Sequence, residues 1–149
     1  MNTLHNRYTN TTKICIFAKK ILTEKVKYWI DLSDYDLETA EAMLFSRRYL
    51  YVGFMCHQTI EKILKAYYCS KYSETPPFSH NLSLLLNRSG LDDLLEDDFK
   101  EVINILEPLN IEARYPTHKQ LLLKSLTEER CKEILLNTKK FQVWLKEKL

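Results

Sequence analysis

The sequence has few residues that make tight turns: it contains two glycines and four prolines among 149 residues. An all-β sandwich or barrel needs many such turns, so this scarcity argues against that class. Long apolar runs are missing too. The longest run near the start, Ile14–Ala18, is too short to cross a membrane or to form the apolar region of a signal peptide. We therefore expect no membrane association.

A strong charge of one sign is also missing. The 22 basic and 20 acidic residues leave a formal charge of +2, whereas a nucleic-acid-binding domain is usually strongly basic. Binding of RNA or a nucleotide would therefore need a local patch. None of the four cysteines forms a C-x-x-C pair, which argues against a zinc or redox motif. We expect reduced cysteines, a cytoplasmic location, no metal and no cofactor.

What the sequence does contain is the helical spacing of apolar residues, every three or four positions. This spacing covers residues 23–48, 49–72, about 92 or 97 to 113, and 127–149, with a shorter stretch after Ser79. The pattern predicts an all-α fold, an antiparallel up-and-down bundle of four main helices plus a short one. Residues 1–23 are polar and poorly patterned, so we expect a loosely ordered N-terminal segment before a bundle domain at 24–149.

Single residues add local predictions. Ser79 and Thr127 are expected to cap the starts of helices, and Gly90 is expected to end the short one. Pro108 lies inside an apolar stripe, where it predicts a kink or a break. Gly53 lies inside the second helix, where a close approach of another helix would explain it.

The stretch from Asn110 to His118 gathers the most chemistry. It contains an amide, a carboxylate, a guanidinium, a phenol and an imidazole, the side chains of Asn110, Glu112, Arg114, Tyr115 and His118. It follows one helical pattern and precedes another, so the bundle is expected to hold it in place. We predict these residues, together with His80, as the candidate ligand site, with Arg114 and His118 as its catalytic pair.

Arg114 and His118 could together cleave RNA. Arginine binds phosphate through a planar fork of donors and keeps its charge, and histidine moves a proton near neutral pH. His118 would act as general acid or base, while Arg114 would stabilise charge on the phosphoryl group. The structural alternative is that Arg114 pairs with Glu112 or with a carboxylate of the first helix, and that His118 faces solvent in a loop.

Two other groups of polar residues have structural alternatives. His57, Glu61 and Lys65 share one face of the second helix, which is expected to be a solvated face rather than a metal site, since a third ligand is missing. Glu61 and Lys65 are expected to pair at i,i+4. His80 precedes the short helix, where it would either contact an anion or pack in the loop.

The order of these features resembles the HEPN domain family, the higher eukaryote and prokaryote nucleotide-binding domain. The resemblance covers residues from about 24 to the C-terminus and rests on the segments Trp29–Leu44, Tyr51–Tyr67, Ser79–Leu82 and Asn110–Pro116. The second segment contains Gln-Thr-Ile-Glu-Lys-Ile-Leu-Lys-Ala, and the fourth contains Glu-Ala-Arg-Tyr-Pro.

The resemblance implies an antiparallel bundle that forms a homodimer. It also implies one of two roles: a metal-independent ribonuclease, the toxin of a pair whose antitoxin is a minimal nucleotidyltransferase, or a non-catalytic partner module of such a nucleotidyltransferase. Active members carry an arginine and a histidine with a longer spacer than the three residues between Arg114 and His118. Tyr115 also replaces the usual polar residue after the arginine. The sequence therefore leaves open whether the protein cleaves RNA or only binds it.

Overall fold

The computed structural model describes residues 3–112, 115 and 119–149, and the regular elements of this part of the chain are all helical. The predicted all-α class is confirmed. In chain order the elements are α1 (Thr3–Phe45), α2 (Tyr49–Tyr72), α3 (Leu82–Arg88), the 3-10 turn η1 (Asp92–Leu94), α4 (Asp97–Leu106), α5 (Leu109–Glu112), α6 (Lys119–Ser125) and α7 (Glu128–Lys146).

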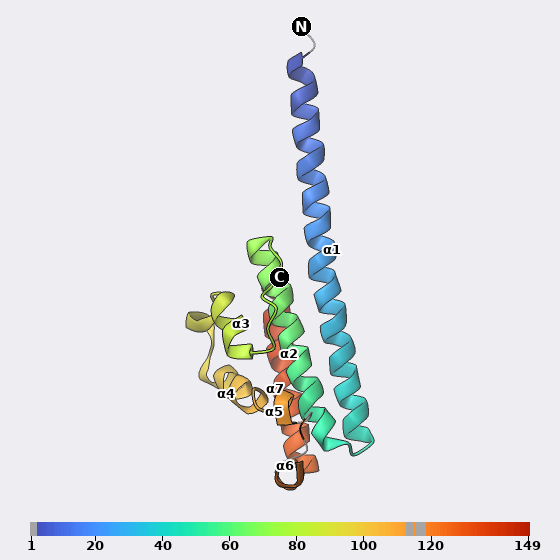
Figure 1. Ribbon diagram of the computed structural model, residues 1–149, viewed down its shortest axis with the longest axis vertical. Coiled ribbons are helices and arrows are strands. Elements are labelled where there is room, and N and C mark those ends of the chain that lie inside the picture. The colour runs from blue at the N-terminus through green and yellow to red at the C-terminus, as the bar shows by residue number, and fades with distance from the viewer. Residues whose placement is uncertain (1–2, 113–114, 116–118) are drawn as a thin grey trace.

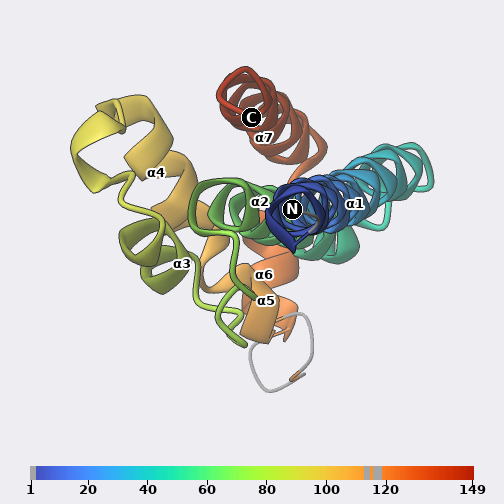
Figure 2. The ribbon, with the colours of Figure 1, turned by 90° about the horizontal axis from the view of Figure 1, so that it is seen from above.

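The bundle is organised around α2 (Figure 1). α1 runs antiparallel to α2 and packs along it, while α7 contacts both and runs in the same direction as α2. α3 and α4 cover another side of α2, and the short helices α5 and α6 lie near its N-terminal end. Seen from above, α1 lies at the outside of the bundle, with α2 and α7 beside it (Figure 2).

The core follows from the apolar stripes of these helices. The stripe of α2 is buried as predicted, and it meets Phe141 and Leu145 of α7 and Leu106 of α4. An aromatic group links α4 to α7, because the Phe99 ring lies 5.2 Å from Phe141 and 5.1 Å from Trp144 between centroids. Burial of these side chains, each contributing roughly 1.5–3 kcal/mol, is the main force that holds the bundle together.

The start of the first helix differs from the prediction. The pattern predicted a helix from Thr23 and a loosely ordered segment before it, but α1 begins at Thr3 and continues unbroken to Phe45. The apolar spacing that packs against the bundle does begin near Val26, which is why the sequence placed the start there. From Ile14 to Lys20 every side chain is exposed. This part of α1 is therefore helical without burying an apolar face in its own chain.

The predicted helix ends are mostly confirmed. Thr127 caps α7, where its hydroxyl accepts a hydrogen bond from the Arg130 amide at 3.2 Å. Gly90 follows α3 with a φ of +67°, a conformation that only glycine adopts readily. The prediction for Ser79 is wrong. Asn81 caps α3 instead, and its side chain accepts from the Leu84 amide at 2.6 Å.

Pro108 breaks the helix as predicted. α4 ends at Leu106, and the separate short helix α5 begins at Leu109. Proline lacks an amide hydrogen and clashes with the preceding turn, so it kinks or breaks a helix, and at this position the helix is broken. The break turns α5 toward α2, where it packs against the N-terminal half of that helix.

Gly53 marks this close approach. A Cβ atom added at Gly53 would lie only 2.7 Å from Cδ1 of Leu109. The glycine therefore lets α5 approach the α2 backbone, as the sequence predicted for this position.

All four cysteines are free, Cys15 at the surface and Cys56, Cys69 and Cys131 in the interior. Burial raises the pKa of Cys56 to about 12 and that of Cys131 to about 11, so both stay thiols at neutral pH. No helix within the described ranges has the length and apolar content that crossing a membrane requires.

Candidate functional site

One face of α2 is polar and yet buried. His57 is 0% exposed, Glu61 1% and Lys65 6%. The expectation of a solvated face is therefore wrong. The reason is tertiary: α1 covers one edge of this face, and the chain around α3 and α5 covers the other. Buried charge is costly unless it is paired and hydrogen-bonded, so this face needs partners.

Glu61 supplies those partners. One carboxylate oxygen accepts from Lys65 Nζ at 2.7 Å, which confirms the predicted i,i+4 pair, and the other accepts from His80 Nδ1 at 2.9 Å. Burial by itself would raise the pKa of Glu61, but the hydrogen bonds from Lys65 and His80 outweigh it and hold the pKa below its ordinary value. Lys65 also lies 5.2 Å from the ring of Trp29 on α1, a cation–π contact.

The hydrogen bond that His80 donates to Glu61 fixes which ring nitrogen faces inward. An ionised carboxylate only accepts hydrogen bonds, so Nδ1 of His80 must carry the proton. Nε2 is then the ring atom left for a ligand, and half of the His80 side chain is exposed. A buried carboxylate behind an exposed imidazole is an arrangement that proteins use to orient histidine for proton transfer. The Phe78 ring lies 6.4 Å from this imidazole and is fully exposed.

His57, one turn before Glu61, is unusual because neither ring nitrogen has a hydrogen-bond partner among the described residues. Burial lowers its pKa to about 4, although the carboxylates of Glu61 and Glu107 act in the opposite direction. His57 is therefore neutral at physiological pH. An unsatisfied buried donor costs about 1–3 kcal/mol, so this position is not explained by stability.

Glu107 is a residue that the sequence analysis missed. Its carboxylate accepts from the backbone amides of Leu82 and Ser83, each at 3.0 Å, and so fixes the start of α3 from the far end of α4. A negative charge is favourable at a helix start and unfavourable at a helix end. A glutamate directly after α4 and directly before Pro108 was the signal that this side chain serves another helix.

A hydrogen-bonded chain leads from this face to the candidate stretch. Lys62 donates to Gln58 at 2.7 Å, and Gln58 donates to the side-chain oxygen of Asn110 at 3.4 Å. Asn110 is 7% exposed. α2 thus holds the beginning of the stretch at α5. Lys62 also lies 3.7 Å from Asp36, whose pKa is raised by burial.

The predicted site residues divide into two groups. Asn110 and His80 are described, and both contact side chains of α2. Tyr115 is described and exposed, and its amide donates to the Ile111 carbonyl at 3.3 Å. Arg114 and His118 lie outside the described residues, and so does the side chain of Glu112, whose backbone ends α5. The predicted catalytic pair remains a prediction.

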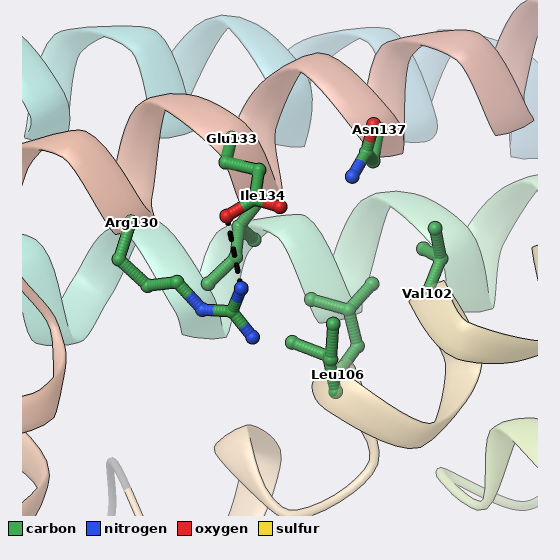
Figure 3. A pocket seen from close by; sticks show the side chains of 7 residues that line it. Val102, Leu106, Arg130, Glu133, Ile134 and Asn137 are labelled. Atoms are coloured by element: carbon green, nitrogen blue, oxygen red, sulfur yellow. Dashed lines mark hydrogen bonds and ion pairs between the residues drawn. The ribbon is translucent and has the colours of Figure 1, made fainter. Parts of the chain in front are cut away.

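The hollows of the surface lie elsewhere. A crevice between α4 and α7 holds about 10 Å³ and is lined by Val102, Leu106 and Ile134, with the Arg130–Glu133 ion pair at its edge (Figure 3). That volume is about one water molecule and is too small for a nucleotide. A wider groove of about 440 Å³ beside it carries four acidic side chains and one lysine, a net negative charge that disfavours a phosphate ligand: Glu96, Asp98, Glu101, Glu133 and Lys140. Among the described side chains, no group of three or more His, Cys, Asp or Glu residues could hold a metal ion.

The comparisons with known proteins identify the family. The sequence matches the HEPN domain over residues 26–148, which is most of the chain. The chain belongs to the HEPN domain family. No curated protein matches its sequence. HEPN membership supports a function related to nucleotides or RNA in general, and it confirms the resemblance drawn from the four sequence segments.

A solved structure supports the same fold. The crystal structure of TT1696 from Thermus thermophilus superposes with a TM-score of 0.72 at 22% sequence identity, covering 84% of this chain and 98% of that chain. At this identity the likeness concerns the fold alone. Within the HEPN domain of this chain, the second sequence segment contains the buried polar face of α2, and the fourth is the stretch that Asn110 begins.

Proposed function

We propose that this HEPN domain binds RNA or a nucleotide beside the polar face of α2 and cleaves RNA without a metal ion. The observation that supports it most directly is the Glu61–His80 pair, in which a buried carboxylate orients an exposed imidazole. A surface histidine whose ring is oriented by a carboxylate can accept a proton from, or return one to, a ligand hydroxyl. Glu61 lies on the same helix as Gln58, which contacts Asn110 at the start of the candidate stretch.

In the proposed reaction, the ribose 2′-hydroxyl loses its proton to an imidazole and attacks the adjacent phosphorus atom. The bond from phosphorus to the 5′-oxygen breaks, and that oxygen takes up a proton. His118 would act as one proton carrier, and Arg114 would stabilise the charge on the phosphoryl oxygens. His80 and Asn110 would contact the ligand, together with Glu112 and Tyr115. Such a ribonuclease would act as a toxin, with a minimal nucleotidyltransferase as its antitoxin.

The test is an incubation of purified protein with a mixed RNA pool in excess EDTA, beside an Arg114→Ala/His118→Ala double variant. We expect cleavage by the wild type alone. Cleavage by both proteins would remove Arg114 and His118 from the mechanism. Absence of cleavage, with RNA binding that Arg114→Ala abolishes, would reduce the function to binding.

A second function is supported by the exposed apolar residues of the same region. Ile111 is 61% exposed and Tyr115 65%, next to the buried Asn110. Exposed apolar side chains beside a fixed anchor are typical of protein contacts. The alternative proposal is therefore a non-catalytic partner module that binds a minimal nucleotidyltransferase. Co-expression with a nucleotidyltransferase encoded beside it would yield a stable complex, and Ile111→Asp would dissociate that complex. A chain that elutes alone would contradict this alternative.

A further inference from the structure

The loop that joins α2 to α3, residues 73–81, runs back along α2 and carries an exposed aromatic ring (Figure 1). The ring belongs to Phe78, which is more exposed than any other large apolar residue of the described chain. An apolar side chain stabilises a fold through the surface that it buries. The fold therefore gains nothing from the position of Phe78, and the ring is available to a ligand.

The backbone on both sides of Phe78 is fixed. Pro76 is buried, and Pro77 and Ser79 are half-buried. The proline rings restrict φ just before Phe78, and the Ser79 amide donates to the Pro77 carbonyl at 2.9 Å, which closes a tight turn centred on Phe78. The Asn81 amide then donates to the Ser79 hydroxyl at 3.1 Å. A ligand that binds this ring therefore has little loop motion to suppress, which favours affinity.

The imidazole of His80 lies next to this ring. The two ring centroids are 6.4 Å apart and their planes are inclined at 57°, so the imidazole does not cover the face of the phenyl ring. Glu61 holds the imidazole from behind through Nδ1 at 2.9 Å, which leaves Nε2 for a ligand. The separation of the two rings is comparable with the distance from the centre of a nucleobase to its own ribose. One nucleotide can therefore contact both residues.

The surroundings of Phe78 favour a nucleobase over a protein partner. A protein interface needs a contiguous apolar area of several hundred Å², whereas a base needs the face of a single ring. The other exposed residues of this loop are all polar: Ser73, Glu74, Thr75, His80 and Asn81. The loop thus offers one aromatic face in a polar setting, with an oriented histidine beside it.

We propose that Phe78 stacks on an unpaired nucleobase and that the ribose of the same nucleotide lies at Nε2 of His80. This inference rests on the proposed RNA function and narrows its substrate to single-stranded RNA, because a base inside a duplex has no free face to offer. Every base has a π-face, so this contact selects for strandedness and not for sequence.

The first experiment measures binding of a fluorescein-labelled RNA oligonucleotide by fluorescence anisotropy in excess EDTA, as a single strand and annealed to its complement. The wild type is expected to bind the single strand more tightly. Phe78→Ala is expected to weaken that binding roughly 5- to 150-fold, and Phe78→Tyr is expected to keep it. Phe45→Ala is the matched control, because Phe45 is 91% exposed at the end of α1, and it is expected to bind as the wild type does.

Phe78→Leu distinguishes stacking from a plain apolar contact. Leucine keeps an apolar side chain and removes the ring, so this variant is expected to bind as weakly as Phe78→Ala. Because the residue is exposed, unchanged melting temperatures are expected for all of these variants. A leucine variant with wild-type affinity overturns the proposal, and so does a wild type that binds the duplex as tightly as the single strand.

Tryptophan fluorescence reports the stacked base directly. Phe78→Trp places an indole in the loop, whereas the native Trp29 and Trp144 are half-buried. The added emission is expected to be quenched by the single strand, because a base that stacks on an indole quenches it. Phe45→Trp is expected to show no such quenching. Equal quenching in both variants, or none in either while RNA is bound, overturns the proposal.

The ribose contact is tested with a DNA strand of the same sequence. The wild type is expected to bind this DNA more weakly than the RNA, and His80→Ala is expected to reduce that preference, because the variant has no imidazole to contact the 2′-hydroxyl. An equal preference for RNA in both proteins overturns the placement of the ribose at His80.

The outcomes separate this inference from the function on which it rests. If the wild type binds no RNA, the proposed function and the stacking contact fall together. If the wild type binds and cleaves RNA while Phe78→Ala keeps full affinity, only the stacking contact is overturned. If Phe78→Ala keeps its RNA affinity and loses a protein partner, the ring is a protein contact and the inference is overturned as well.

Discussion

At the scale of single residues, the polar face of α2 distinguishes this molecule from a plain helical bundle. His57, Glu61 and Lys65 are enclosed, yet only two of the three are satisfied by the described residues. A paired charge in the interior specifies how its neighbours are arranged. An unpaired neutral imidazole adds no such contact. We therefore expect that removing one charge of the Glu61–Lys65 pair destabilises the protein, and that replacing the His57 imidazole by an apolar side chain does not.

His57 predicts a specific loss of stability in acid. Its pKa is about 4 in the folded protein and about 6.5 in the unfolded chain, so the unfolded state binds more protons between these values. The stability that His57 contributes is therefore complete above pH 6.5 and is lost as the pH falls toward 4. The difference reaches about 3 kcal/mol.

The measurement is the free energy of unfolding by urea at several pH values, for the wild type and for His57→Leu. Leucine has a similar volume and cannot be protonated. We expect the variant to be as stable as the wild type or more stable at pH 7, and to lose less stability on acidification. Parallel pH profiles for both proteins would mean that His57 does not titrate as a buried group.

Lys65 predicts a large effect for one member of a buried pair. Lys65→Met leaves the Glu61 carboxylate buried with fewer donors, which costs on the order of 3 kcal/mol. Lys132→Met is the matched control, because Lys132 and Glu128 form an exposed pair with the same i,i+4 spacing and order. Such a surface pair contributes less than about 1 kcal/mol. Equal losses in chemical denaturation would contradict a buried pair.

The Glu61→Gln/Lys65→Met double variant and its two single variants form a double-mutant cycle. It removes both charges, so it is expected to lose less stability than the sum of its single variants. Strict additivity would show that the two side chains do not interact. In the RNA assay, Glu61→Gln is expected to slow cleavage, because the carboxamide no longer fixes the tautomer of His80.

At the scale of elements, the molecule depends on how closely the short helices approach α2. α5 exists as a separate element because Pro108 ends α4, and it reaches α2 because Gly53 has no Cβ. Glu107, between α4 and Pro108, caps α3 at the same place. α3, α4 and α5 are thereby held against α2.

Gly53→Ala tests this approach. Alanine favours a helix over glycine by about 1 kcal/mol, but its Cβ would lie 2.7 Å from Leu109 Cδ1, and overpacking in a core costs about 1–3 kcal/mol. We expect a net destabilisation of about 1 kcal/mol, measured by thermal unfolding.

Leu109 supplies the internal control for that experiment. In a Leu109→Ala background the clashing methyl group is absent, so Gly53→Ala is expected to be neutral or stabilising. A destabilisation of equal size in both backgrounds would assign the effect to something other than the contact with Leu109.

At the scale of the whole molecule, α1 joins two different environments. From Val26 onward it packs into the bundle, and before Ala18 it has none of the described bundle beside it. The family match begins at residue 26, at the start of the packed part. The division into residues 1–23 and a domain at 24–149 stays a prediction.

Removal of residues 1–22 tests that division. The core begins farther along α1, near Val26, so the shortened chain is expected to keep its melting temperature within a few degrees. Loss of cooperative unfolding would mean that the N-terminal segment belongs to the folded domain.

The sequence by itself determined what depends on neighbours within a few residues. The spacing of apolar residues predicted the helices, Thr127 and Gly90 marked their ends, and Pro108 marked the break. These predictions succeeded because helix hydrogen bonds, caps and the proline ring act over one or two turns. The family motifs belong here as well, because they are local segments whose order is visible in the sequence.

Only the tertiary structure decided which polar residues lie inside. His57, Glu61 and Lys65 have the periodicity of a solvated face, and their burial depends on α1, α3 and α5 covering them. Glu107 reaches Leu82 at the start of α3 from a position 25 residues later in the chain, and the extension of α1 leaves Ile14 and Phe17 exposed. Burial and charge pairing depend on elements that are far apart in sequence, and for this reason local patterns could not reveal them.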